Sequence, residues 1–266
     1  MDSDLEKAIK QLVEKAASID VEISATEAVK LTQFVSDLIA YNAHTNLVGS
    51  AEPGEIVINH VLDSLSLLPI IKNRLKKQSP LRLIDIGTGA GFPGIVLALM
   101  LEQVVLTLVD ATQKKTRFVK QEVKTLRLSN VEVITARAED LAHQSSQRDK
   151  YDFATGRALG CADMLMELAL PFLALGGLLL VQKSQAQKEA ELRNIRACTW
   201  TLGAKLEHCI DLDEGIFAKA RVIIVVSKNS PTDSTYPRQW SKIKAQPLSY
   251  KGAPSVSETN QPSADA

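Results

Sequence analysis

The fold is decided by one stretch of the chain, Leu83-Ile84-Asp85-Ile86-Gly87-Thr88-Gly89-Ala90-Gly91-Phe92-Pro93-Gly94. Its first part is apolar with β-branched members, as a central strand of a parallel sheet is. The glycines at every second position let the backbone turn sharply and approach a ligand closely. Pro93 fits the first turn of a helix, because the N–H that proline lacks has no partner there. The stretch therefore predicts a buried strand, a glycine-rich turn and a helix.

The glycine-rich turn admits two registers, which favour different ligands. From Gly89 it is a G-x-G-x-x-G pattern, the fingerprint of dinucleotide sites. From Asp85 it is D-x-G-x-G-x-G, with a carboxylate that can reach the amino group of an amino-acid-like ligand. A nicotinamide site instead offers its helix N-terminus to a pyrophosphate. The acid-first register favours S-adenosylmethionine, which carries an ammonium and a sulfonium but no phosphate, and a nicotinamide oxidoreductase is the alternative.

The composition limits the classes of function. The chain has 266 residues and is 45% hydrophobic, enough for one sizeable core with appendages. Its 31 basic and 31 acidic residues balance, so any RNA contact must come from local patches. Three cysteines without C-x-x-C spacing indicate a reducing compartment and no metal site. No apolar run approaches ~20 residues and the N-terminus is unlike a signal peptide, so we expect a cytoplasmic protein.

The chain divides into three segments. Residues 1–76 carry apolar residues at helical spacing, and Ser24 with Glu27 forms a capping-box start, so we expect an N-terminal helical region. Residues 77–228 alternate strands and helices, which predicts an α/β domain with a mostly parallel sheet and an antiparallel last hairpin. Residues 229–266 are rich in Pro, Ser, Thr and Lys, and we expect a basic, largely flexible extension.

Polar residues follow the predicted strands at the edge where open α/β sheets bind ligands. Asp110 ends the second strand, where an acid hydrogen-bonds ribose hydroxyls; an N-cap for the next helix is the alternative. Glu139, next to Ala138, follows the third strand beside the expected adenine; a solvated surface glutamate is the alternative. Arg157 closes the fourth strand and Lys183 the fifth. We expect all of them at one crevice.

These motifs resemble those of the bacterial 16S ribosomal RNA (guanine-N7) methyltransferase G family, also called glucose-inhibited division protein B. The Gly-Phe-Pro-Gly ending of the turn and the stretch His60-Val61-Leu62-Asp63-Ser64-Leu65 are specific to it. The likeness covers roughly residues 25–228. It extends to further positions: Asn42, Asn46-Leu47, Asp110 with Lys114-Lys115, Arg137-Ala138-Glu139, Arg157-Ala158 and Lys183. Tyr236-Pro237-Arg238 resembles the C-terminal extension of some members.

The resemblance implies a Rossmann-like class I methyltransferase fold with a seven-stranded sheet. It also implies methyl transfer from S-adenosylmethionine to N7 of a guanine in 16S ribosomal RNA. Guanine N7 carries an in-plane lone pair and no proton, so its methylation needs no general base. The absence of an obvious catalytic dyad is therefore expected. We expect a monomer that acts on 16S ribosomal RNA or the small ribosomal subunit, with no metal and no membrane partner.

The predicted site residues fall into three groups. Those for the cofactor are Asp85, Gly87, Gly89, Gly91, Phe92, Asp110, Ala138, Glu139 and Arg157. The catalytic candidates are Arg157 and Lys183, which suit guanine O6 or a neighbouring phosphate. The substrate-binding candidates, which would close the crevice, are Asn46, His60, Asp63 and Lys183. A helix-capping role for His60 and Asp63 is the alternative.

The sequence departs from the pattern of this family in two places, and one alternative function remains open. Ser184 follows Lys183 where many members of the family have Gly, and the acidic stretch 211–214 gives no support to an RNA surface. The alternative function is a non-catalytic RNA- or ribosome-binding module that retains the fold. Its candidate surface is a basic helix face, Lys114, Lys115, Arg117, Lys120, Lys124 and Arg127. A solvated helix face of this kind needs no function.

Overall fold

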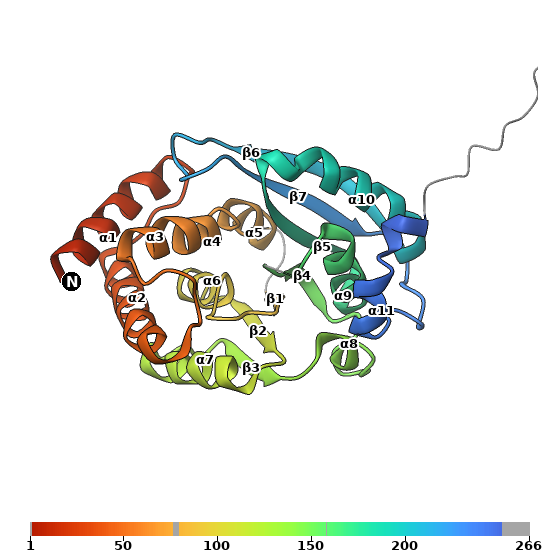
Figure 1. Cartoon of the computed structure of the whole chain (residues 1–266), viewed down its shortest axis with the longest axis horizontal. Helices are drawn as coiled ribbons and strands as arrows, with labels where there is room; N and C mark the ends of the chain where they lie inside the picture. The colour runs from red at the N-terminus through yellow and green to blue at the C-terminus, as the bar shows by residue number, and fades with distance from the viewer. Residues whose placement is uncertain (1, 77–79, 158, 252–266) are drawn as a thin grey trace, which may run out of the picture.

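A computed structural model describes residues 2–76, 80–157 and 159–251 of the chain. Within these ranges seven strands form one sheet, in the order β3-β2-β1-β4-β5-β7-β6 (Figure 1). The strands are β1 (Leu81–Ile86), β2 (Val104–Asp110), β3 (Val131–Thr135), β4 (Tyr151–Thr155), β5 (Leu173–Ser184), β6 (Ala204–Leu212) and β7 (Arg221–Lys228). β1 to β5 run parallel, and β7 is antiparallel to both β5 and β6. The predicted sheet, with its antiparallel last hairpin, is confirmed.

β1 is covered by hydrophobic residues on both faces. Leu81 and Leu83 belong to one core, whereas Ile84 and Ile86 belong to the core on the opposite face. Successive side chains of a strand point to opposite faces, so a strand buried on both sides is apolar at nearly every position. This is why the sequence of β1 shows a continuous apolar run interrupted only by Arg82 and Asp85.

The N-terminal helices pack on one face of the sheet, and they share its core. They are α1 (Asp2–Ala17), α2 (Ala25–Thr45), α3 (Pro53–Ile56), the π-helical turn η1 (Val57–Leu62), α4 (Asp63–Leu65) and α5 (Leu68–Leu75). Leu12 and Phe34 are fully buried in the same core as Leu83. The predicted capping box at the start of α2 is confirmed, because Ser24 Oγ accepts from the Glu27 N–H and Glu27 accepts from the Ser24 N–H.

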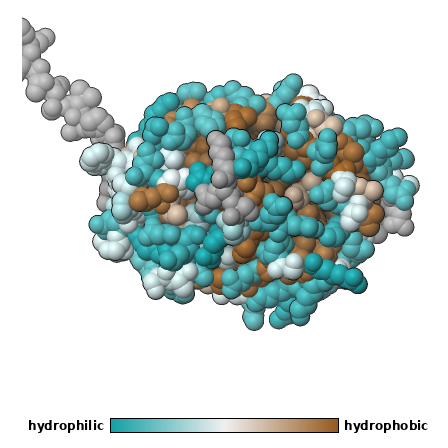
Figure 2. Space-filling model, turned by 180° about the vertical axis from the view of Figure 1, so that it is seen from behind, coloured by the Kyte–Doolittle hydropathy of each residue, from teal (hydrophilic) through white to brown (hydrophobic). Residues whose placement is uncertain are grey.

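One continuous helical stretch, Pro53–Leu75, is long and apolar enough to cross a membrane, which the search for apolar runs in the sequence missed. In its most apolar window, 61% is buried inside the fold. A helix in the core of a folded domain meets the same criteria of length and composition, and Leu62, Leu65 and Leu68 are fully buried here. Seen from behind, the molecule is mostly hydrophilic, with hydrophobic residues visible between hydrophilic ones (Figure 2).

The remaining helices follow the strands and cover both faces of the sheet (Figure 1). They are α6 (Gly94–Met100), α7 (Gln113–Thr125), α8 (Ala138–Leu141), α9 (Ala162–Ala169), η2 (Leu170–Phe172), η3 (Gln185–Gln187) and α10 (Lys188–Leu202). α6 and α7 pack with the N-terminal helices, whereas α9 and α10 pack on the opposite face. The described helices thus sandwich the parallel strands, as the alternating sequence pattern predicts.

The C-terminal extension differs from the expectation of a largely flexible segment over 229–266. Its described part contains α11 (Trp240–Ala245) and η4 (Leu248–Lys251). The side chains of Ile243 and Leu248 are buried, and the former is fully so. Polar composition misled the prediction because hydrogen bonds to distant residues also fix the extension, which composition does not show. The rest of the extension, residues 252–266, lies outside the described residues, as do 77–79 and Ala158.

Candidate active site

The turn after β1 adopts the conformation that its glycines predict. Gly87, Gly89 and Gly91 have φ angles of +68°, +59° and +96°, in the left-handed region where a Cβ is unfavourable. Gly94, the first residue of α6, has a different reason to be glycine. A Cβ there would lie 2.3 Å from Leu108 Cδ2 and 2.9 Å from Asp85 Oδ2. Glycine therefore allows the start of α6 to pack directly against β1 and β2.

Asp85 lies beneath this turn rather than in the crevice. Its side chain is fully buried, and Oδ2 accepts a hydrogen bond of 3.1 Å from the Gly94 N–H. Burial raises the pKa of the Asp85 carboxyl to about 7, although hydrogen bonds from the Thr88 side chain and the Gly94 N–H act in the opposite direction. This placement differs from the expectation that the Asp85 carboxylate contacts the amino group of a ligand directly. Asp85 supports the turn from below, because residue 85 is still part of β1 and its side chain points toward the start of α6.

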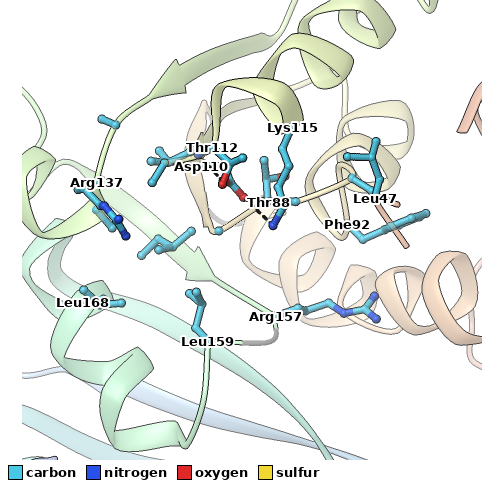
Figure 3. A pocket seen from close by; sticks show the side chains of 18 of the residues that line it. Leu47, Thr88, Phe92, Asp110, Thr112, Lys115, Arg137, Arg157, Leu159 and Leu168 are labelled. Atoms are coloured by element: carbon cyan, nitrogen blue, oxygen red, sulfur yellow. Dashed lines mark hydrogen bonds and ion pairs between the residues drawn. The ribbon is translucent and has the colours of Figure 1, made fainter. Parts of the chain in front are cut away.

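A cavity of 370 Å³ opens at the carboxyl ends of β1 to β4, and we call it the donor cavity. Its volume lies in the range of ~300–1,000 Å³ that small-molecule sites occupy. It straddles β1 and β4, where the strand order reverses, which is the usual ligand position in open α/β sheets. Its lining includes Gly87, Thr88, Gly89, Phe92, Asp110, Lys115, Arg137, Ala138, Glu139, Arg157, Leu159, Leu168 and Trp240. Figure 3 shows Asp110 and Lys115 on one side and Leu159 and Arg157 on the other.

Asp110 connects two walls of the donor cavity. Its Oδ2 accepts from the Gly89 N–H at 3.0 Å, and its Oδ1 accepts from the Thr112 N–H at 2.8 Å. The Lys115 ammonium lies 3.9 Å from Oδ2. The N-cap of α7 is Thr112, so the alternative in which Asp110 is itself the cap is wrong. Asp110 lines the cavity where it was predicted, and it also fixes the turn after β1 against the loop after β2.

The end of β3 forms another wall. Ala138 and Glu139 begin the short helix α8, and both line the donor cavity. Glu139 is only 6% exposed, so the alternative of a solvated surface glutamate is wrong. Leu168 of α9 and Trp240 of α11 line the same cavity. The cavity therefore joins the end of β3 to helices that are far away in the sequence.

The N-terminal helical region supplies the wall opposite α8, through Leu47, Val48 and His60. Asn42 holds the loop, because its Nδ2 donates to the Val48 carbonyl at 3.1 Å and its Oδ1 accepts from the Val48 N–H at 2.9 Å. Asn46 is the left-handed C-cap of α2, with φ +52°, and does not line the cavity. Its placement differs from the expectation of a crevice residue, because it is needed to end the helix.

Arg157 connects the crevice to the N-terminal region. Its Nη2 donates to His60 Nδ1 at 2.9 Å and to the Asn59 carbonyl at 3.2 Å, and its Nη1 lies 3.4 Å from Asp63 Oδ2. Arg221 Nε approaches the other oxygen of Asp63 at 3.8 Å. The buried Asp63 carboxylate is therefore held between two guanidinium groups. His60 and Asp63 thus belong to a charged network at the sheet edge, rather than to the helix-capping pair given as the alternative.

His60 stacks on Phe92 with the ring centroids 5.0 Å apart. Burial lowers the pKa of His60 to about 4, and the charge of Arg157 lowers it further. The imidazole is therefore neutral near pH 7, and its Nδ1 is free to accept the hydrogen bond from Arg157. This pair places an aromatic ring and a fixed guanidinium side by side at the rim of the donor cavity.

A second cavity, of 530 Å³, adjoins the donor cavity, and we call it the charged cavity. The two share Arg157 and Leu159. The charged cavity is also lined by Asp63, Gln182, Lys183, Ser184, Glu191 and Arg221. Lys183 Nζ lies 2.8 Å from Glu191 Oε1 and donates to the Gly160 carbonyl at 2.6 Å. Nowhere in the described ranges do three or more His, Cys, Asp or Glu side chains gather so that they could hold a metal ion.

Sequence reasoning missed part of the site. Val48, Leu159, Leu168 and Trp240 line the donor cavity but carry no motif of their own. Apolar residues in loops and helices are ordinarily packing residues, so their type gives no signal. A usable signal exists only for Leu47, which follows Asn46 in a stretch that the resemblance already includes.

Comparison with known families identifies the family to which the chain belongs. The model of the family described as rRNA small subunit methyltransferase G matches residues 27–215. The chain belongs to this family. It is 36% identical to a protein of Desulfitobacterium hafniense named ribosomal RNA small subunit methyltransferase G, over 86% of this chain and 93% of that protein. A relative of the same name from Leuconostoc citreum is 39% identical, over 79% of this chain and 87% of that protein.

Among solved structures, the chain is similar to one titled a SAM dependent methyltransferase from Aquifex aeolicus. The identity is 16%, the coverage is 63% of this chain and 95% of that one, and the TM-score is 0.44. The family assignment rests on the sequence matches alone. These matches confirm the resemblance that the glycine-rich turn and the His60–Leu65 stretch indicate, and they leave no support for a nicotinamide oxidoreductase.

Proposed function

We propose that this protein transfers a methyl group from S-adenosylmethionine to N7 of a guanine in 16S ribosomal RNA. The observation that carries the proposal is the meeting of two cavities at Arg157, one built on the glycine-rich turn and one lined by charged side chains. A group-transfer enzyme needs such a pair, because donor and acceptor must approach each other in line. The family of rRNA small subunit methyltransferases supports ribosomal RNA as the acceptor class.

The donor cavity fits S-adenosylmethionine by its shape and by its polar groups. The left-handed turn at Gly87, Gly89 and Gly91 brings the backbone close to the cavity, which Gly87, Thr88 and Gly89 line. We assign Asp110, the acid at the end of β2, to the ribose hydroxyls, and Ala138 and Glu139, which line the cavity after β3, to the adenine. When bound, S-adenosylmethionine supplies a methyl group on a positively charged sulfur, which is already a good electrophile.

The residues of this chain orient the acceptor rather than exchange protons with it. Guanine N7 attacks with its own lone pair, so no side chain has to remove a proton. Arg157 is held by His60, Asn59 and Asp63, and it stands at the boundary of both cavities. We assign it the role of positioning the guanine, through O6 or a neighbouring phosphate. Lys183 lines the charged cavity, and we assign it the same role toward guanine O6 or a neighbouring phosphate.

The charged cavity is the proposed acceptor site, and a target base would enter it unstacked. His60 and Asp63 contribute through Arg157, whereas Asn46 contributes by ending α2 at the loop that lines the donor cavity. We further propose a monomer that works in the cytoplasm, where ribosomes are assembled. Residues 1–76, 77–228 and 229–266 are the proposed N-terminal, methyltransferase and C-terminal segments.

The test is methyl transfer from isotope-labelled S-adenosylmethionine to small ribosomal subunits and to free 16S RNA that lack the modification. We expect label on guanine N7, located by mass spectrometry of nuclease digests, with one of the two substrates preferred. Binding of the donor is measured separately by calorimetry. Donor binding without transfer to either substrate would contradict the enzymatic proposal and favour a binding module that retains the fold.

A further inference from the structure

The C-terminal extension is fixed against α8 and α9 by charged and backbone contacts. Arg148 donates to the Thr232 carbonyl at 2.7 Å and to the Tyr236 carbonyl at 2.9 Å. Arg238 forms a bidentate pair with Glu167 of α9, with Nη2 at 2.6 Å and Nε at 2.7 Å from the two carboxylate oxygens. Glu167 is fully buried. Charge-assisted pairs of this geometry hold both partners in one orientation.

The same contacts bring the extension to the donor cavity. His143 Nε2 lies 2.9 Å from the Pro237 carbonyl, just beyond the end of α8. Three residues after Pro237, Trp240 begins α11 and lines the donor cavity together with Ala138, Glu139 and Leu168. Figure 1 shows α11 beside α9 on the side of the sheet where α8 lies. The extension therefore contributes a large aromatic ring to a site that is otherwise formed by residues 47–168.

We infer that Trp240 is a specificity-determining residue of the donor site, against which the adenine ring of S-adenosylmethionine packs. The inference rests on the proposed function, because that function assigns the wall at Ala138 and Glu139 to the adenine. An indole suits this position, since its flat apolar face stacks on a purine and it has few rotamers to immobilise. Trp240 is half-buried, so part of the ring is available to a ligand.

The position of Trp240 in the chain has a further consequence. The match to the family model ends at residue 215, and the extension lies beyond it. The donor site is thus completed by a segment beyond the residues that the family model matches. Removing that segment should weaken donor binding even though every glycine of the turn is retained.

The chain contains two tryptophans, which makes a direct test possible. Trp200 is 95% exposed on α10 and does not line the donor cavity, so Trp200→Phe leaves Trp240 as the single indole reporter. In this background, titration with S-adenosylmethionine or with adenosine alone should change the emission of Trp240. Methionine alone should leave it unchanged, because the ring faces the purine. Unchanged emission at saturating S-adenosylmethionine would overturn the inference.

Calorimetry supplies the energetic test. Trp240→Ala should weaken binding of S-adenosylmethionine and of adenosine by the same factor, about tenfold or more, as loss of a stacked base contact does. Trp240→Phe should restore most of the affinity, and Trp200→Ala is the matched control with no change. Equal affinity of Trp240→Ala and the wild-type protein would refute the inference and leave the proposed function intact. Failure of the wild-type protein to bind the donor would instead refute the proposed function.

Discussion

The two cavities that meet at Arg157 differ in which groups form their walls, backbone atoms of a turn in one and charged side chains in the other. One wall of the donor cavity is formed by backbone, in the turn with left-handed glycines, where Asp110 accepts a hydrogen bond from the Gly89 N–H and Asp85 accepts one from the Gly94 N–H. The charged cavity is shaped by side chains, since Asp63, Arg157, Lys183 and Arg221 come from α4, the loop after β4, β5 and β7. A backbone-built wall is encoded within a dozen consecutive residues. A side-chain-built wall exists only after the sheet and the N-terminal helices have assembled.

Because the walls differ in this way, substitutions in the two cavities should impair the protein by different mechanisms. Substitution in the turn should act through shape, by clash or by unfavourable φ. Substitution in the charged cavity should act through geometry and charge, because the Asp63 carboxylate is held by two guanidinium groups. Exchanges that keep the charge but change the geometry therefore distinguish the two walls most clearly.

The largest effect is expected for Arg157→Lys. Lysine keeps a positive charge near Asp63, but its single ammonium cannot reproduce the fork that reaches His60 Nδ1 and the Asn59 carbonyl. We expect methyl transfer to fall about 100-fold, since loss of a positioning group misplaces the acceptor. Thermal unfolding should change little by comparison. Single-turnover rates with labelled donor measure the effect.

The matched control is Arg193→Lys, at an exposed position of α10. It should leave the transfer rate within about twofold of the wild-type rate, because a surface substitution of this kind changes free energies by about 0.5 kcal/mol or less. Full activity of Arg157→Lys would show that charge alone suffices in the charged cavity, and the proposed contrast between the two walls would be lost.

The next effect concerns the backbone-built wall. Gly94→Ala places a Cβ 2.3 Å from Leu108 Cδ2 and 2.9 Å from Asp85 Oδ2. Overpacking of this kind costs about 1–3 kcal/mol of unfolding free energy. Gly49→Ala is the control, because its Cβ would meet nothing within 4 Å. Urea denaturation with both variants measures the difference, and equal midpoints would mean that β1 and α6 move apart without cost.

The contrast between the walls also explains what the sequence could predict. The strand, turn and helix at residues 81–100 follow from local signals, and Asp110, Glu139 and Arg157 follow from the rule that strand ends share one edge. Asp85 shows the limit of the same reasoning. Its spacing to the glycines is visible in the sequence, but its burial beneath α6 depends on how closely Gly94 packs, which no spacing reports.

The parts that could not be predicted depend on contacts over long sequence distances. The extension looked flexible by composition, yet Arg148 and Glu167 hold it from 70 to 90 residues away, as in the pair between Glu167 and Arg238 with a separation of 71 residues. The same holds for Trp240 and Leu168, which reach the donor cavity only because α9 and α11 pack together. Pairings between distant elements leave no periodic trace in a single sequence.

A third prediction uses two buried groups whose contributions to stability depend on pH in opposite directions, Asp85 beneath the glycine-rich turn and His60 at the rim of the donor cavity. Asp85 has a pKa of about 7 in the fold against 3.8 ordinarily, so the folded protein holds a proton that the unfolded chain has lost between these values. Its contribution to stability therefore falls as pH rises from about 4 to 7. His60 has a pKa of about 4 against 6.5, so the unfolded chain holds the extra proton and stability rises over this range.

The two contributions oppose each other between about pH 4 and 6.5, so single variants should reveal them. Relative to wild type, Asp85→Asn should gain stability with rising pH, whereas His60→Gln should lose it, each by roughly 1–3 kcal/mol across the window. Urea midpoints at pH 4.5 and 6.5 measure both differences. Parallel pH profiles for the two variants and the wild type would show that neither group is buried in the way described.

The smallest effect concerns the predicted basic face of α7. Its residues fall into two groups, one with contacts inside the fold and one at the surface. Lys114 donates to the Thr45 carbonyl at 2.8 Å and Lys115 pairs with Asp110, so both serve the fold. Arg117, Lys120 and Lys124 instead line a shallow groove at the surface. If the groove follows an RNA backbone, each cation neutralises about one phosphate, and Lys120→Ala should reduce the salt dependence of RNA binding by about one in the slope of log K against log salt.

Filter binding of 16S RNA over a range of salt concentrations decides between an RNA surface and a solvated helix face. Lys10→Ala on α1 is the control, because Lys10 is also exposed but lies outside the groove. Identical slopes for Lys120→Ala, Lys10→Ala and wild type would assign the α7 groove to solvent. RNA would then have to be held by the rim of the charged cavity, where Arg157, Lys183 and Arg221 already lie.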